Sequence, residues 1–341
     1  MTGVKALVKK ILILLMWYPL RITIAFLPLP LVALIGRGGG RVLHLLSREK
    51  QRAMLEEFRR ILPGRSRSEL LAAVRESFVN FCCSEMEILL YPSMDRRYID
   101  RVFAIEGKEH LDSALARGRG VLLFQAHFGA FQMTMPAIGY SGYTMNQISA
   151  SAAVWKEGNA SAAGNRTIDI KARYEYTLPV RHISVTSSLR PVFRALERNE
   201  IVGITVDGGG GKKIVPLRFL GRNSFFQTGA ADLAISTGAA IVPAFITTEP
   251  GLRHRLVLHA PIAVDEGRGK EENRLAVLRE FASLLESHVL RHPHHYGYTL
   301  CLRRQRARID PYPFFDDYGA SDEAGSVPNS PRKAHGHAET E

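Results

Sequence analysis

The sequence predicts an α/β fold in which a mixed β-sheet is flanked by helices and preceded by an N-terminal hydrophobic helical segment. Three observations predict it. From residue 102 onward, short apolar runs alternate with amphipathic stretches at helical spacing. One of these runs, residues 120–126, is almost continuously apolar, which is typical of a strand buried in a sheet. The chain has 341 residues, of which 46% are hydrophobic and 23% charged, so it can bury a substantial core.

The charge balance favours an anionic partner. The chain has 45 Lys and Arg against 33 Asp and Glu, a formal net charge of +12. This excess suits membrane headgroups, nucleic acid or an acidic carrier. The mixture of apolar and charged residues excludes a disordered, collagen-like or multi-span membrane chain. The three cysteines are too few for a disulfide framework and lack metal-ligand spacing, which favours a reducing compartment.

Residues 1–40 form a segment that we expect to associate with a membrane. Residues 11–35 are long enough to span a bilayer only if a central Arg21 and three prolines are accepted. Basic residues lie on both sides of this apolar run, which fits a segment that enters one leaflet and returns better than one that crosses. No small-residue cleavage site follows, so a removed signal peptide is not expected. A crossing helix and a buried helical hairpin are the alternatives.

Residues 41–308 are predicted to form the α/β domain. Apolar spacing predicts helices over 41–62 and from a cap at Ser66 or Ser68 to Leu90. The predicted strands are 102–105, 120–126, 145–149, 201–206, 241–247 and 255–258. The predicted helices between them are 107–117, 130–138, 189–198, 229–237 and 271–292. Residues 309–341 lose this periodicity and are predicted to be a flexible tail.

His127 is the first candidate for chemistry. The apolar strand 120–126 delivers it to a turn before the helix predicted for 130–138, and α/β proteins build ligand crevices at this end of a strand. The small Gly129 would let a substrate approach, and the Gln132 amide is close enough in sequence to reach back to the ring. A structural histidine is the alternative.

Asp207 opens a second segment, in which four glycines and two lysines follow the strand predicted for 201–206. A glycine run before a lysine is similar to a phosphate-binding loop, but the spacing of the Walker pattern is missing. Lys212 would therefore either contact an anionic group from a mobile loop or lie in a plain surface turn.

A third segment contains Phe219, Gly221 and Arg222 and continues through Thr228 and Gly229. Thr228 is a suitable cap for the helix that follows it. The cluster His292-Pro293-His294-His295 has no carboxylate or cysteine at ligand spacing, so we assign it to the surface and expect no metal.

Taken in order, these segments resemble the lysophospholipid acyltransferase superfamily, and most closely its branch of bacterial lipid A biosynthesis (lauroyl/myristoyl) acyltransferases. The resemblance covers residues 20–306. It implies a glycerol-3-phosphate acyltransferase-like fold at the cytoplasmic face of the bacterial inner membrane. It also implies transfer of a fatty acyl chain from a thioester on acyl carrier protein or CoA to a hydroxyl of a lipid or glycolipid, lipid A being the natural example, without a cofactor.

The resemblance also implies roles for individual residues. His127 would be the general base, Gln132 stands where the family has an acid, and Asp207 is the first candidate for its substitute. The residues expected to contact substrate are Gly129, Arg166, Arg190, Lys212, Phe219, Gly221, Arg222, Thr228 and Gly229. The acyl chain would need an apolar slot, for which Phe128, Phe131, Met133 and Met135 are candidates, unless they are ordinary core residues.

Gln132 leaves three interpretations open. An amide can orient the ring but brings no negative charge, so the protein would be a slower enzyme or one that takes its charge from elsewhere. The third interpretation is a catalytically inactive lipid-binding protein with the same fold. Nucleic-acid binding ranks below these, because the basic residues are dispersed and no recognition motif appears.

Overall fold

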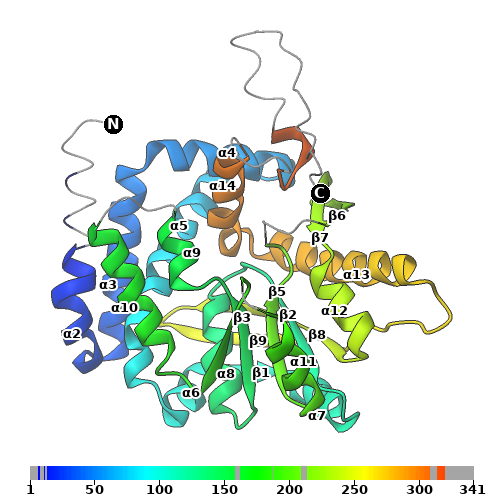
Figure 1. The fold of residues 1–341 in the computed structure, drawn as a ribbon. Helices are drawn as coiled ribbons and strands as arrows, with labels where there is room; N and C mark the ends of the chain where they lie inside the picture. The colour runs from blue at the N-terminus through cyan, green and yellow to red at the C-terminus, as the bar shows by residue number, and fades with distance from the viewer. Residues whose placement is uncertain are drawn as a thin grey trace, which may run out of the picture.

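A seven-stranded mixed sheet forms the centre of the molecule in the computed structural model (Figure 1). The structure describes residues 7, 11, 14–157, 162–186, 188–208, 213–307 and 313–318. The strands of this sheet are β1 (Phe103–Glu106), β2 (Val121–Gln125), β3 (Met145–Ser149), β4 (Val180–Ser184), β5 (Ile201–Thr205), β8 (Ala240–Glu249) and β9 (Arg253–Leu258). Their order is β1-β9-β8-β2-β5-β3-β4, and all pairs are parallel except β8 with β9. The predicted fold class is confirmed.

Strand β2 lies in the middle of the sheet, between β8 and β5. All of its residues are buried, which is why its sequence is apolar without alternation. Its register with β5 places Gln125 opposite Thr205. Both strands therefore end at the same edge, and the residues that follow them meet there.

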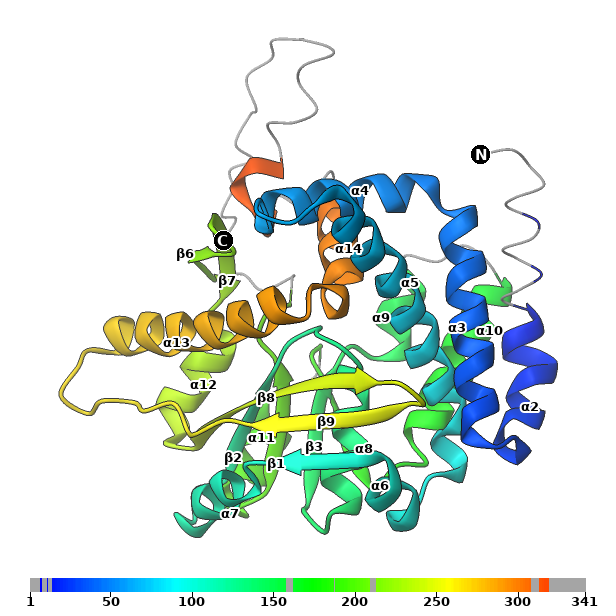
Figure 2. The same ribbon diagram turned by 180° about the vertical axis from the view of Figure 1, so that it is seen from behind.

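Helices lie on both faces of the sheet and around its edges (Figures 1 and 2). They are α2 (Arg21–Thr23), α3 (Leu29–Leu46), α4 (Arg48–Ile61), α5 (Arg67–Leu90), α6 (Arg96–Val102), α7 (Lys108–Ala116), α8 (Thr134–Tyr140), α9 (Ala152–Glu157), α10 (Ala162–Glu175), α11 (Arg190–Glu197), α12 (Gly229–Thr237), α13 (Lys270–Arg291) and α14 (Gly297–Arg306). Along β2, Leu122 and Phe124 join the buried cluster that includes α12, α13 and α14. Val121 and Leu123 join the cluster on the other face, with α7, α8 and the end of α5.

The helices before the sheet differ from the prediction at one boundary. We predicted a single helix over 41–62, but the structure has α3 from Leu29 and α4 from Arg48, separated at Ser47, whose φ of −120° and ψ of 52° are not helical. Ser66 is the cap of α5: its Oγ accepts from the Glu69 N–H, and the Glu69 carboxylate accepts from the Ser66 N–H. This reciprocal pair fixes where α5 begins.

A small antiparallel hairpin stands beside the main sheet. Its strands are β6 (Ile214–Phe219) and β7 (Arg222–Gln227), which the sequence prediction did not identify. Residues 313–318 pack on this hairpin, with a bridge between Ser224 and Phe315. We predicted that the flexible tail starts at 309, and for residues 313–318 this is wrong, because Phe314, Phe315 and Tyr318 are buried.

The N-terminal segment is helical but irregular. Residues 16–20 form a π-helical turn, α2 follows, and 24–26 form a 3₁₀ turn before Pro28 starts α3. Among the described residues, α3 alone has the length and mean hydropathy of a membrane-crossing helix, and 22% of it is buried. The segment exposes large apolar side chains, including Ile22 at 60%, Phe26 at 85% and Leu34 at 61%.

Candidate active site

Asp207 lies against the ring of His127, at the edge where β2 and β5 end. The His127 Nδ1 is 2.8 Å from Asp207 Oδ1, and the His127 main-chain N–H donates to both carboxylate oxygens at 3.0 and 3.1 Å. Asp207 is fully buried, whereas the His127 side chain is 36% exposed. The pair therefore has a buried anion on one side and an imidazole that solvent and ligands can reach on the other.

Several groups keep the Asp207 carboxyl ionised. Burial by itself would raise its pKa, but the charge and hydrogen bond of His127, the charge of Arg303 and the hydroxyl of Tyr296 lower the pKa to about 2. The Tyr296 hydroxyl donates to Oδ2 at 2.8 Å. Because an ionised carboxylate only accepts hydrogen bonds, the ring donates through Nδ1, and Nε2 is left as the basic atom.

Two further contacts fix the turn that carries His127. The Thr299 hydroxyl donates to the His127 carbonyl at 2.6 Å, and the Gly129 N–H donates to the His295 carbonyl at 2.9 Å. Gly129 has a φ of +60°, and a side chain there would overlap the Ile246 carbonyl oxygen. Glycine is required at this position for packing against β8. The space that we expected a substrate to use is filled by the backbone of β8.

Gln132 lies in the short 3₁₀ turn Phe131–Met133, before α8. Its carbonyl accepts from the Tyr91 hydroxyl, but no hydrogen bond joins its side chain to the His127 ring in the described part of the chain. The carboxylate that contacts the ring comes from Asp207, which is distant in sequence.

A large apolar cavity lies between the N-terminal segment and α3, α5, α10 and α14. Its volume is about 930 Å³, and its walls include Trp17, Phe81 and Tyr298. Lys171 and Glu85 form an ion pair at its wall, with Nζ and the carboxylate 2.8 Å apart. Tyr298 precedes Thr299, the residue bonded to the His127 turn, so α14 is shared by the cavity and the His127–Asp207 pair.

The family model for bacterial lipid A biosynthesis acyltransferases matches residues 5–304. The chain belongs to this family. Phosphatidylinositol mannoside acyltransferases from two Mycobacterium tuberculosis strains, CDC 1551 / Oshkosh and ATCC 25618 / H37Rv, are each 26% identical to it over 203 residues. The match covers 57% of this chain and spans 60% of the length of these relatives.

In this acyltransferase family member, several residues predicted to contact substrate form no hydrogen bond or ion pair with His127 or Asp207 in the described part of the chain. Arg166 is exposed on α10, and Arg190 is exposed at the first position of α11. Thr228 is buried, and its hydroxyl bonds to the Asp232 carboxylate at 2.8 Å instead of capping α12. Gly229 is the first residue of α12. Lys212 lies outside the described residues.

The hairpin residues have structural contacts. Phe219 is fully buried and packs against Tyr296, with ring centroids 6.2 Å apart. Gly221 forms the hairpin turn with a φ of +72°. Arg222 is 8% exposed, and its guanidinium bonds to Glu57 at 2.6 Å and to Asp317. Its charge is already paired, so we do not assign it to phosphate binding.

Burial bears on two other expectations. We assigned His292–His295 to the surface, but His295 is 7% exposed and its ring is 3.1 Å from the Asn80 amide nitrogen. For Phe128, Phe131, Met133 and Met135 we left open an acyl-chain slot or ordinary core packing. Phe128, Met133 and Met135 are at most 6% exposed and belong to the core clusters, and Phe131 is partly buried against one of them. Phe and Met are among the residue types most often found fully buried.

Sequence reasoning missed Tyr296 and Thr299. They follow the His292–His295 turn, as the N-cap and in the first turn of α14, and their hydroxyls donate to the Asp207 carboxylate and to the His127 carbonyl. The sequence feature that came closest to indicating them was the resemblance to the acyltransferase family around Tyr298–Arg304. No spacing in the sequence connects Tyr296 with Asp207.

Proposed function

We propose that this protein transfers a fatty acyl chain from an acyl thioester to a hydroxyl group of a lipid or glycolipid. His127 acts as the general base, and Asp207 orients and stabilises it. The observation that carries the proposal is the 2.8 Å contact between an accessible imidazole and a buried, ionised carboxylate in a chain of this family. Gln132 does not leave the ring without an anion, because Asp207 supplies one.

The reaction follows from the tautomer that Asp207 selects. As the acceptor hydroxyl oxygen bonds to the thioester carbonyl carbon, Nε2 of His127 takes the hydroxyl proton. Asp207 stabilises the imidazolium that results. When the tetrahedral intermediate collapses, the C–S bond breaks, and the imidazolium returns the proton to the leaving thiolate. The products are the acyl ester and the free thiol.

We place the hydrocarbon chain in the cavity beside the N-terminal segment. Its volume of about 930 Å³ lies within the roughly 300–1,000 Å³ that small-molecule sites occupy. Its walls are largely apolar, and the ion pair of Lys171 with Glu85 gives it a polar part. The shared helix α14 supports a chain that lies in the cavity while its carbonyl reaches His127.

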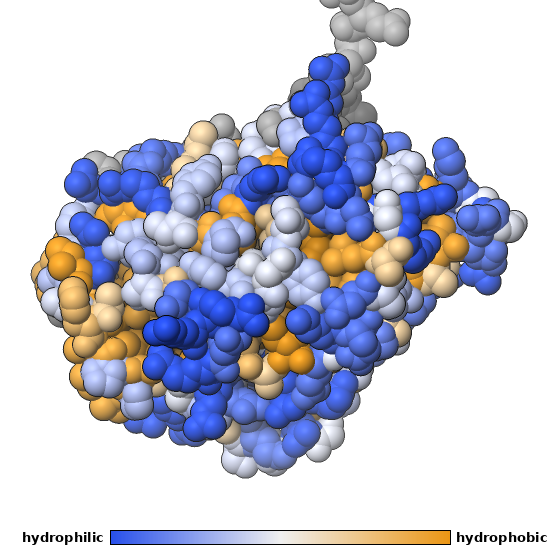
Figure 3. Space-filling model, turned by 90° about the horizontal axis from the view of Figure 1, so that it is seen from below, coloured by the Kyte–Doolittle hydropathy of each residue, from blue (hydrophilic) through white to orange (hydrophobic). Residues whose placement is uncertain are grey.

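We also propose that the N-terminal segment lies on the bacterial inner membrane, with the catalytic domain on the cytoplasmic face. Figure 3 shows apolar surface gathered along the edge that α2 and α3 occupy in Figure 1. The exposed side chains include Phe26, Leu31 and Leu34, and Arg37 and Arg41 follow on α3. Exposed apolar residues next to basic ones are typical of a helix at a membrane interface.

The names of the family and of the relatives support a proposal for the acceptor class. The family name refers to lipid A, and the mycobacterial relatives are named for phosphatidylinositol mannosides. Both names denote lipids with sugar headgroups. We therefore propose a glycolipid hydroxyl as the acceptor.

The test is acyl transfer by purified protein from acyl-CoA or acyl carrier protein to a panel of phospholipids and glycolipids. We expect wild type to form an acyl ester, and His127→Ala to reduce the rate to background. His110→Ala, a histidine on α7, is the matched control and should retain activity. Equal transfer by wild type and His127→Ala would overturn the proposed mechanism.

Gln132 favours the alternative of an inactive lipid-binding protein, and one substitution separates the two. If Asp207 supplies the charge, Gln132→Glu should change the transfer rate little or lower it, because a second carboxylate near the ring is not needed. A large gain from a near-zero rate would instead indicate a decayed enzyme. The measurement is the initial rate at saturating donor.

A further inference from the structure

A basic groove lies between the β6–β7 hairpin and the C-terminal half of α13. Its volume is about 940 Å³, and its walls include Arg218 and Gly221 of the hairpin and Arg279, Glu286 and Arg291 of α13. We propose that this groove docks an acidic carrier protein that delivers the acyl thioester, an inference that rests on the proposed function.

Three guanidinium groups give the groove its charge. Arg218 donates to the Asn223 side-chain oxygen and the Gly221 carbonyl, and Arg291 donates to Ser287. These acceptors are neutral. Within the described ranges, no ion pair is found for Arg218, Arg279 or Arg291. The buried Arg222, by contrast, pairs with Glu57 and Asp317.

The one carboxylate that lines the groove is already engaged. Glu286 accepts the main-chain N–H of Leu220 at 2.6 Å and so holds the hairpin against α13. The lining residues that the structure describes include three arginines and this one carboxylate, so the groove keeps a net positive charge. Guanidinium groups bind carboxylates in pairs of hydrogen bonds, which suits an acidic protein surface.

Both walls of the groove are connected to the His127–Asp207 pair through Tyr296. Residues alternate along β6, so Arg218 is exposed while Phe219 is buried against Tyr296, whose hydroxyl bonds to Asp207. The other wall, α13, ends at Arg291, and the chain continues directly through residues 293–295 to Tyr296. A carrier seated here would hold its thioester arm close to the catalytic edge.

The position of the groove favours a soluble protein over a lipid headgroup. The hairpin and α13 lie on the opposite side of the molecule from α2 and α3, in both views (Figures 1 and 2). If the exposed apolar residues of α2 and α3 contact the bilayer, the groove faces the aqueous side. A water-soluble donor reaches that side, and a membrane lipid does not.

The experiment compares Arg218→Glu/Arg279→Glu/Arg291→Glu with wild type. We expect the affinity for purified, fatty-acylated bacterial acyl carrier protein to weaken roughly tenfold or more and to lose its dependence on salt. The KM for the acylated carrier should rise, while kinetics with acyl-pantetheine, a small donor without phosphate, should stay unchanged. Arg52→Glu/Arg67→Glu/Arg97→Glu is the control, because it makes the same charge change at exposed arginines on α4, α5 and α6.

Unchanged carrier binding in the groove variant would overturn the inference, as would an equal loss in the control variant. Loss of binding to vesicles of anionic phospholipid, with carrier binding intact, would also overturn it and assign the groove to lipid. If carrier binding depends on the groove but no donor supports transfer, the docking surface stands and the proposed function fails. If acyl-pantetheine supports transfer but no carrier binds, the function stands and the docking surface fails.

Discussion

The tautomer of His127 depends on Asp207, whose carboxylate contacts the ring. A neutral imidazole has two tautomers, and only one presents Nε2 as a base while Nδ1 donates. The Asp207 carboxylate selects that tautomer, and it is itself held by the His127 main-chain N–H and by the Tyr296 hydroxyl. Both carboxylate oxygens are bonded, so the ring has a fixed partner.

Replacing the Asp207 carboxylate should lower the rate of acyl transfer without preventing substrate binding. We expect Asp207→Asn to lower kcat roughly 10²- to 10⁴-fold, because an amide cannot stabilise the imidazolium and no longer selects the tautomer. Substrate KM should change little. The comparison is steady-state kinetics against Asp100→Asn, whose carboxylate pairs with Arg96 on the exposed surface of α6. A similar small loss in both variants would contradict the role of Asp207.

The lowered pKa of Asp207 also predicts how stability depends on pH. Its folded pKa of about 2 lies below its ordinary value of 3.8, so ionised Asp207 stabilises the fold above about pH 4. This contribution is lost as pH falls toward 2, where the folded state also takes up a proton. In urea unfolding between pH 6 and pH 2.5, the stability difference between wild type and Asp207→Asn should therefore shrink on acidification. A difference that stays constant would contradict this assignment.

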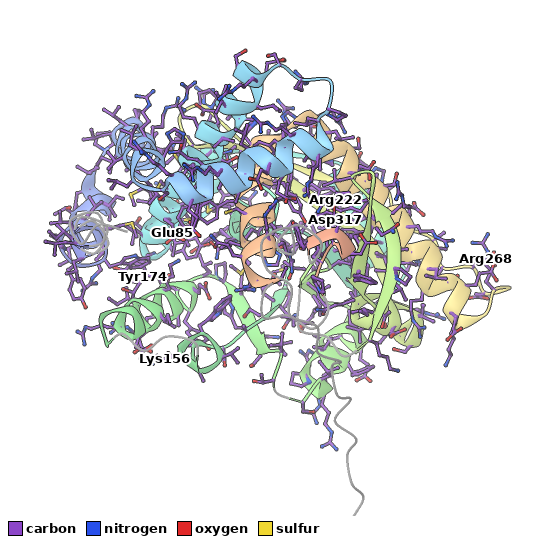
Figure 4. The ribbon with its side chains drawn as sticks, turned by 90° about the horizontal axis from the view of Figure 1, so that it is seen from above. Glu85, Lys156, Tyr174, Arg222, Arg268 and Asp317 are labelled. Atoms are coloured by element: carbon purple, nitrogen blue, oxygen red, sulfur yellow. The ribbon has the colours of Figure 1, made fainter. Side chains whose placement is uncertain are left out.

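At the scale of elements, the β6–β7 hairpin is attached by a buried ionic cluster. Arg222 from β7 and Arg304 from α14 both bond to Glu57 of α4, and Tyr318 and Asp317 of segment 313–318 complete the cluster. Figure 4 shows Arg222 and Asp317 side by side. The Arg222 guanidinium also lies 3.7 Å from the centroid of the Phe315 ring. The cluster joins four segments that are distant in sequence.

Breaking this cluster at its centre should be costly. Glu57→Gln leaves Arg222 and Arg304 without their buried carboxylate, and we expect a loss of about 3 kcal/mol in the free energy of unfolding. Arg60→Met removes a partner of the same Asp317 at a site where both side chains are at least 33% exposed, and this should cost at most about 1 kcal/mol. Thermal and urea unfolding measure both. Equal losses would show that burial does not set the energy here.

At the scale of the whole molecule, two surfaces of different character lie on opposite sides. The N-terminal segment with α3 exposes large apolar side chains. The hairpin and α13 expose Arg218, Arg279 and Arg291, for which no ion pair is found among the described residues. Strands β2 and β5 lie between them (Figure 1). A lipid acceptor arriving from one side and a soluble donor from the other would meet there.

Membrane attachment should depend on the exposed apolar residues of the N-terminal segment. We expect Phe26→Glu/Leu34→Glu to reduce binding to phospholipid vesicles roughly tenfold or more, because each large apolar side chain that enters the bilayer contributes about 1.5–3 kcal/mol when fully buried. Leu71→Glu/Tyr176→Glu changes two exposed residues on other elements and is the control. Co-sedimentation with vesicles is the measurement. Equal retention of both variants would place the membrane contact elsewhere.

Local pattern was enough to predict most of the main sheet. Strand β3 and helix α12 have the predicted bounds, and β2, β5, β8 and β9 differ from theirs by a few residues. Apolar runs and helix caps depend on residues that are close together in the sequence, so elements defined by them can be predicted from the sequence. The hairpin, segment 313–318 and strand β4 of the main sheet were not predicted. They carry polar and charged residues between apolar ones, and their burial depends on partners far away in the chain.

The sequence by itself determined the α/β fold, the family and the position of His127 at the end of a central strand. It also nominated Asp207, through the resemblance. Tertiary structure alone decided that the Asp207 carboxylate contacts the ring and that Gln132 does not. It also decided that Gly129 and Arg222 pack and pair within the protein. A hydrogen bond requires two groups to meet within about 3 Å, and the register of β2 with β5, not spacing along the chain, brings residues 127 and 207 that close.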